Sequence, residues 1–151
     1  MMNRPAAGAA PEPGPDARLR TMRILWAVLL ACVGQFALVA WFARPEADAP
    51  AEGVPTLLYA LGALGLGSVA SSFVIKSGYF RRAAERREPA QIQTGFIVAM
   101  VLCEVAALLG LVGLFVTQCD YAYGLLALGA LGEIMHFPRR EQLTPAYYKS
   151  V

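Results

Sequence analysis

Four long apolar runs, separated by short charged segments, constrain this chain more than any other feature of its sequence. The runs cover residues 24–43, 54–75, 92–117 and 121–137. An α-helix needs about 20 apolar residues to cross the hydrocarbon core of a bilayer, which is about 30 Å thick. The first three runs reach that length, and the fourth lies at the short end of the range. We therefore predict an all-α, polytopic membrane protein folded as a four-transmembrane-helix bundle.

The composition agrees with this class of protein. The chain is 57% hydrophobic and only 16% charged, whereas an ordinary soluble domain is about 25% charged. Its length of 151 residues is that of a single domain. The net charge of +2 provides no long basic surface, so we expect the lipid bilayer as a partner and no nucleic acid.

Lysine and arginine residues alternate between the segments that flank the runs. They are frequent before the first run, between the second and third, and after the fourth, whereas the other two loops hold a single arginine, Arg44. Cytoplasmic loops of membrane proteins carry an excess of lysine and arginine. We therefore expect a multi-pass protein of the cell membrane, in a bacterium the inner membrane, with both termini in the cytoplasm.

The two ends of the chain differ from the apolar middle. Residues 1–20 are rich in proline, alanine and glycine, and this composition predicts disorder. Residues 21–140 form the predicted transmembrane domain, and residues 141–151 form a cytoplasmic tail. The first run is longer than the apolar core of a signal peptide, which is about 7–15 residues, so we expect an anchor rather than a cleaved leader.

Small residues are concentrated in the second, third and fourth runs, and in lipid they allow helices to approach closely. Ala63, Gly67 and Ser71 follow one another at intervals of four, which places them on one helix face. The main expectation is tight packing of these three helices, and the same stripe suits a second copy of the chain or another membrane subunit. The residues assigned to helix packing are Gly62, Gly65, Gly67, Ser71, Gly110 and Gly113.

Glu104 is an acidic residue inside an apolar run. Counted from Thr94, it lies roughly 15 Å along its helix, near the bilayer centre. An acidic group there costs about 2.5–3.5 kcal/mol, and the cost falls if the carboxyl stays protonated. Gln35 and Ser68 lie at a similar depth and are the expected hydrogen-bond partners. Two interpretations stay open: a neutral carboxyl that ties helices together, and a proton carrier.

Glu133 and His136 stand three residues apart, directly before a basic segment that starts at Pro138. This spacing places both on one helical face, where they can pair with each other or with the arginines. Because they lie near the cytoplasmic interface, we expect them to reach water. The alternative is an exit path for protons.

Catalytic and metal-binding motifs are missing from the sequence. The three cysteines include no CxxC pair, and a single histidine cannot form a multi-histidine site within one copy. No nucleotide-binding loop or dinucleotide fingerprint occurs either. We therefore expect neither an enzyme nor a cofactor or metal.

Residues 58–115 resemble the helical hairpin of rotary ATP synthase c-ring subunits. The resemblance is carried by GALGLGSVASS, then AERREPAQ, then a long apolar segment that holds Glu104. It implies that Glu104 is the ion-binding carboxylate, that Arg87-Glu88-Pro89 is the cytoplasmic loop motif, and that copies form a ring. The chain departs from the family in its interrupted glycine repeat, in the glutamate of its loop and in its two additional helices.

Three functions follow from these observations. The first is a structural or interaction subunit of a membrane complex, formed with other membrane proteins or with copies of itself. The second is a c-ring-like subunit that translocates protons through Glu104. The third is a small transporter or channel.

Overall fold

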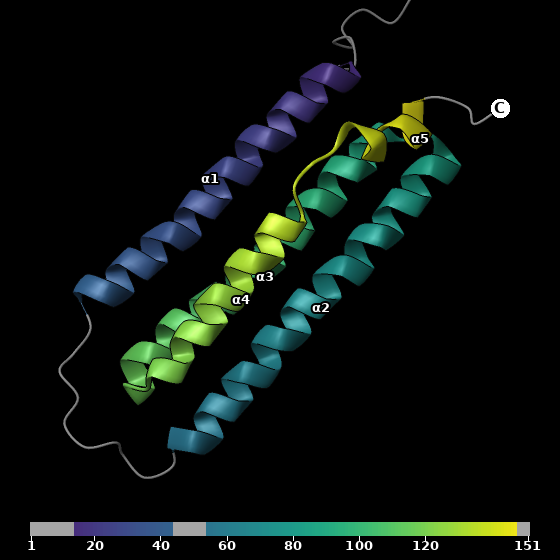
Figure 1. Cartoon of the computed structure of the whole chain (residues 1–151). Coiled ribbons are helices and arrows are strands. Elements are labelled where there is room, and N and C mark those ends of the chain that lie inside the picture. Colours follow the sequence, from purple (N-terminus) through teal and green to yellow (C-terminus); the bar gives the residue numbers. More distant parts are fainter. Residues whose placement is uncertain (1–13, 44–53, 148–151) are drawn as a thin grey trace, which may run out of the picture.

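The computed structural model describes residues 14–43 and 54–147, and every regular element within them is a helix. The predicted all-α class is therefore confirmed. The four larger helices run roughly along one axis, and a short helix lies near one end (Figure 1). The elements are α1 (Pro15–Phe42), α2 (Val54–Arg86), α3 (Pro89–Thr117), a 3-10 turn (Asp120–Ala122), α4 (Tyr123–Met135), a second 3-10 turn (Arg140–Gln142) and α5 (Thr144–Tyr147).

Three of these helices are long and apolar enough to cross a membrane: α1, α2 from Thr56 onward, and α3. α1 and α2 continue beyond their apolar runs, so residues 15–20 are helical where the sequence predicted disorder. The remainder of that predicted segment, residues 1–13, lies outside the described residues. α4 has 13 residues and is about 20 Å long, so it does not match the length of a hydrocarbon core by itself.

The reversal between α2 and α3 has a clear local cause. Arg87 adopts a left-handed conformation with φ 54°, and the Glu88 N–H donates to the Ala83 carbonyl at 3.1 Å. This is the bonding pattern of a Schellman motif, which ends a helix. Pro89 then opens α3, where its missing N–H costs nothing. The two helices consequently form an antiparallel hairpin.

Glycines set the closest contacts between α3 and α4. A side chain at Gly110 would come within 2.7 Å of the Leu126 nitrogen, and one at Gly129 within 2.7 Å of the Cys103 carbonyl oxygen. Neither position has room for a Cβ atom. The two helices therefore pack backbone to backbone, as small-residue interfaces in membranes do.

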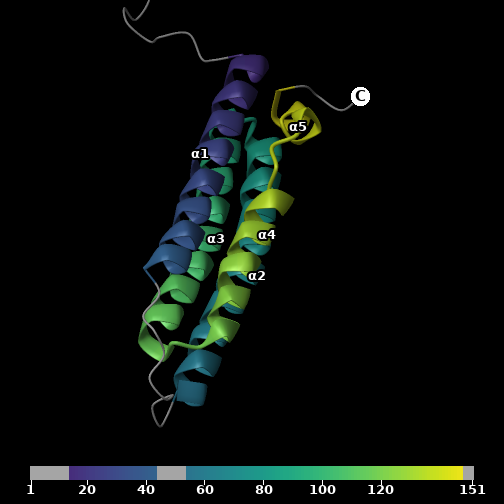
Figure 2. The same cartoon turned by 60° about the vertical axis from the view of Figure 1, so that its left-hand side comes forward.

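α1 packs against α3 and α4 and runs beside them in both views (Figure 2). The Tyr123 hydroxyl donates to the Ala40 carbonyl at 3.3 Å near one end. At the other end, Arg140 lies 3.3 Å from Asp16 in an exposed ion pair. The first turn of α1 and the short helix α5 thus lie at the same end of the bundle. We call it the basic end, because it carries Arg20, Arg81, Arg82, Arg86, Arg87, Arg139 and Arg140.

Candidate functional sites: a buried polar cluster and an outer groove

α4 stops beside the middle of α3. The turn that carries Gly132 packs against α3, since a side chain at Gly132 would meet the Cys103 sulfur at 2.8 Å. The His136 N–H closes the last turn on the Gly132 and Glu133 carbonyls at 3.2 and 3.0 Å. Pro138 follows, and proline prevents the helix from continuing. The chain then runs on as an irregular segment to α5 (Figure 1).

A hydrogen-bonded cluster joins the end of α4 to α2. The His136 Nε2 atom lies 2.8 Å from the Ser72 hydroxyl oxygen, and that hydroxyl donates its proton to the Val69 carbonyl at 2.6 Å. A serine has one proton to give, so Nε2–H must be the donor to Ser72. Nδ1 is then free to accept from the Lys76 ammonium, which lies 3.4 Å away. The network assigns a neutral histidine with its proton on Nε2.

The cluster is sealed from its surroundings. Ser72, His136 and Lys76 are 0%, 1% and 8% exposed. The Cys103 thiol lies 3.6 Å from the Ser72 oxygen, and the Phe73 ring lies 4.4 Å from the imidazole. Lys76 also reaches the His136 carbonyl at 3.5 Å, where a cation favourably meets the negative end of a helix. The expectation that His136 reaches water is therefore wrong, because α2 and α3 supply its polar partners.

Glu133 is also buried, and it is not paired with His136. The residue is 0% exposed, so the prediction of a water-accessible carboxyl is wrong for Glu133 as well. Its two carboxyl oxygens have no hydrogen-bond partner among the described residues. Its backbone carbonyl accepts a hydrogen bond of 2.8 Å from the Trp26 indole. α1 thus covers the turn that carries this acid.

Glu104 and Glu133 lie at the same level of the bundle, because they directly follow Cys103 and Gly132, and a side chain at Gly132 would meet the Cys103 sulfur at 2.8 Å. Ala107 is one turn along α3 from Glu104, and Ala130 is one turn along α4 from Glu133. Both alanines belong to the apolar cluster that α1, α3 and α4 share around Val33. We call the contact between α3 and α4 the seam. The two acids therefore lie along the seam, on the side that faces α1.

The two partners that the sequence suggested for Glu104 lie elsewhere. The Ser68 hydroxyl donates to the Leu102 carbonyl at 2.8 Å, and Gln35 is exposed on α1. Ser68 borders the outer groove beside Leu102 and Val105 of α3, and a depth count along single helices cannot reveal this position. Glu104 instead has a second acid as its neighbour.

The residues assigned to helix packing divide into two groups. Gly65, Gly110 and Gly113 lie at contacts, with a neighbouring atom 2.7–3.3 Å from the place of a Cβ atom. Gly62 and Gly67 have open space there, and Ser71 is exposed. The stripe of Ala63, Gly67 and Ser71 thus faces away from the bundle. It lines a groove of about 470 Å³ together with Leu102, Val105 and Leu109 of α3.

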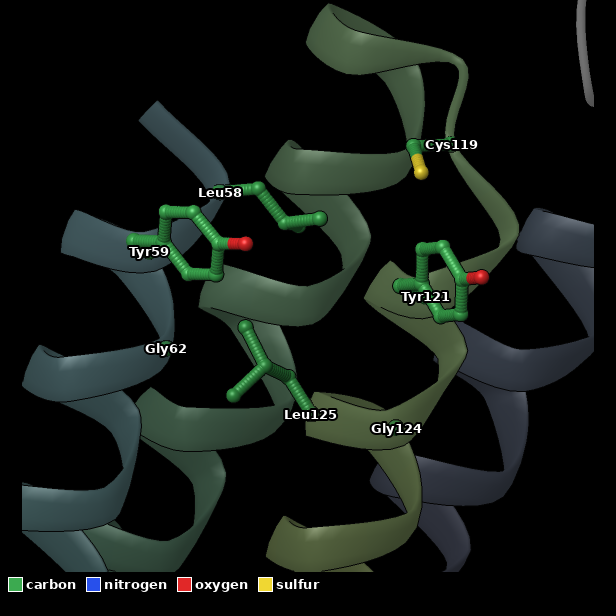
Figure 3. A pocket seen from close by; sticks show the side chains of 7 residues that line it. All are labelled: Leu58, Tyr59, Gly62, Cys119, Tyr121, Gly124 and Leu125. Atoms are coloured by element: carbon green, nitrogen blue, oxygen red, sulfur yellow. The ribbon is translucent and has the colours of Figure 1, made fainter. Parts of the chain in front are cut away.

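A second hollow lies at the end of the bundle opposite the basic end. It has a volume of about 570 Å³ and is lined by α2, the turn after α3, and α4. Tyr59 and Tyr121 stand on either side of it, with Leu125 between them (Figure 3). Its lining is mostly apolar, and Gly62 belongs to it.

Sequence reasoning missed Ser72, Lys76 and the indole of Trp26. Ser72 and Lys76 are four residues apart and share a helix face with Val69. That spacing was the available signal, but only the rotation of α2 about its axis decides that this face turns inward. Within the described residues, no group of three or more His, Cys, Asp or Glu side chains could hold a metal ion.

No protein-family model, curated protein or solved structure matches this chain.

Proposed function

We propose that this chain is a four-crossing protein of the cell membrane and that it serves as an interaction subunit of a membrane complex. α1, α2 and α3 supply three crossings by length and composition. The fourth crossing combines α4 with the irregular segment after it. Non-helical backbone at membrane depth is tolerated where protein buries it, and both Pro138 and Leu143 of that segment are buried.

The charge distribution supports the proposed orientation. The arginines of the basic end come from the start of α1, the end of α2 and the segment after α4. Such clusters favour the cytoplasmic side of a membrane. Both ends of the described chain then face the cytoplasm.

The observation that carries the interaction role is the outward stripe on α2. Ala63, Gly67 and Ser71 permit a close helix approach, yet none of the described helices covers this face. Association in lipid depends on such smooth faces because hydrophobic exclusion gives little there. We propose that this face binds the same face of a second copy of the chain. A two-fold symmetric dimer places the stripe of one copy against the stripe of the other.

The test is the mass of the protein in mild detergent and its cross-linking in native membranes. Wild-type protein should be a dimer, and Gly67→Leu should be a monomer because its side chain fills the groove. Gly34→Leu is the matched control: Gly34 also has open space around it, but it lies on α1. Wild-type monomers in both settings, or a dimer that survives Gly67→Leu, would contradict the proposal.

A c-ring-like assembly is the second candidate. It is supported by the α2–α3 hairpin. The chain reverses direction at Arg87 and Glu88, and the second helix of the hairpin carries Glu104. This reading predicts a large ring in the same mass measurement, whereas the interaction role predicts a dimer. A small transporter or channel would instead give solute flux in reconstituted vesicles.

A further inference from the structure

The Glu133 carboxyl is the least satisfied group in the described bundle. The residue is 0% exposed, and both of its side-chain oxygens lack a hydrogen-bond donor. An ionised carboxylate in such a place has neither water nor a protein dipole to offset its desolvation. Protonation removes most of that cost, because a neutral carboxyl is far cheaper to bury than a carboxylate. The group therefore needs a compensating positive charge, either from a neighbouring cation or from a bound proton.

The charged neighbours within the bundle do not supply that charge. On α2, Lys76 gives its hydrogen bonds to His136. On α1, the Arg23 guanidinium stacks 5.7 Å from the ring of Phe137. Beyond α4, Arg139 is exposed. None of these cations reaches the Glu133 carboxyl oxygens, which have no partner among the described residues.

The neighbours on α3 make the requirement stronger. Glu104 and Glu133 directly follow Cys103 and Gly132, where α3 and α4 touch, so a charge on one acid disfavours a charge on the other. The Cys103 thiol at this contact offers no positive charge. Two neighbouring acids in apolar surroundings favour a state in which at least one of them is protonated, and they titrate as a coupled pair.

We propose that Glu133 and Glu104 form a proton-binding pair inside the membrane domain. In loading, a hydronium ion gives its proton to a carboxylate oxygen, so that one O–H bond breaks, another forms and water is left; in release the carboxyl O–H bond breaks and the proton returns to a water molecule. The pair adds a binding activity to the interaction role and does not depend on it. A proton suits this site better than a divalent cation, because Ca²⁺ takes about six to eight oxygen ligands.

The two acids differ in burial: Glu104 is only partly buried, whereas Glu133 is completely enclosed.

The test is labelling of the full chain with dicyclohexylcarbodiimide, an apolar reagent that modifies protonated carboxyls in apolar surroundings. The protein is reconstituted in phosphatidylcholine vesicles, and each site is quantified by peptide mass spectrometry across a pH series. Labelling of the pair, at Glu104, at Glu133 or at both, should fall reversibly as the pH rises. Glu85, an exposed acid beside Arg81, serves as an internal control and should stay unlabelled at every pH.

The amide variants Glu104→Gln and Glu133→Gln then test whether the acids act as a pair. In the wild type, the loss of labelling should occur in two steps, and in either variant the remaining acid should titrate in one step. Identical profiles in wild type and variants would overturn the pair. Absence of labelling at both acids, labelling that ignores pH, or protection by sodium at fixed pH would overturn proton binding. If a variant fails to fold, the wild-type series alone decides.

Discussion

At the scale of single residues, the assignment of protons around His136 has consequences for stability. Ser72 accepts from the imidazole Nε2–H and from the Cys103 thiol, and it donates to the Val69 carbonyl. It is therefore the residue through which α2, α3 and α4 share hydrogen bonds. Removing its hydroxyl leaves a buried imidazole N–H without an acceptor.

Ser72→Ala should consequently lower the free energy of unfolding by about 1–3 kcal/mol, the range for an orphaned buried polar group. Circular dichroism during thermal unfolding in detergent measures the effect. Ser77→Ala is the matched control, because Ser77 also bonds the carbonyl three residues earlier in α2 but is exposed and lies outside the outward stripe. Its effect should stay within about 0.5 kcal/mol. Equal effects of the two substitutions would show that the proposed network contributes no stability.

At the scale of elements, α4 is a half-length helix whose position depends on glycines of α3 and of its own. Gly110 faces the Leu126 nitrogen, and Gly129 faces the Cys103 carbonyl. The close approach holds the end of α4 at the level of Ser72 and Lys76. Without that approach, the polar cluster could not form across the helices.

Gly110→Ala should therefore destabilise the bundle by about 1–3 kcal/mol, because the new methyl group forces two backbones apart. Gly124→Ala is the control within the same helix pair: Gly124 is exposed on α4 and has open space around it. Alanine there should be neutral or slightly stabilising, since alanine is the better helix former. Thermal unfolding of both variants under one detergent condition decides the comparison. A harmless Gly110→Ala would place α4 farther from α3.

At the scale of the whole molecule, the sequence predicted the all-helical class and the span-length helices because apolar length is a property of a single segment. It did not predict that α4 ends near Met135, because the apolar run continues to Phe137 and the stop depends on Pro138. The rotation of each helix about its axis was also out of reach. Small residues occur on several faces of α2, so sequence alone could not separate Gly65, which is packed, from Gly67, which is exposed.

The same limit applied to the candidate sites. Glu104 stood out because its charge interrupts an apolar run, but its neighbour Glu133 is far along the chain and becomes close only when α4 lies on α3. The burial of His136 likewise depends on three helices at once. Contacts of this kind depend on how each helix is rotated about its axis. Tertiary packing, rather than the local sequence pattern, determines that rotation.

The arrangement of the whole chain across the membrane gives the final prediction. Single cysteines are placed in a background in which the other native cysteines are replaced by alanine, and intact cells are treated with a membrane-impermeant maleimide. Native Cys119 reports the turn between α3 and α4, and Glu85→Cys and Glu141→Cys report the basic end. Both substituted acids are exposed, so the changes should cost little stability.

Cys119 should react from outside, whereas the two substituted positions should react only after the membrane is permeabilised. The opposite pattern would reverse the proposed orientation. Reaction of Glu141→Cys from outside, with Glu85→Cys protected, would mean three crossings and a C-terminal segment on the outer face. That result would also conflict with the fold, because Arg140 lies 3.3 Å from Asp16 at the start of α1. The side of the membrane on which Glu141→Cys reacts therefore tests two features together: the fourth crossing, and the contact between Arg140 and the start of α1 at the basic end.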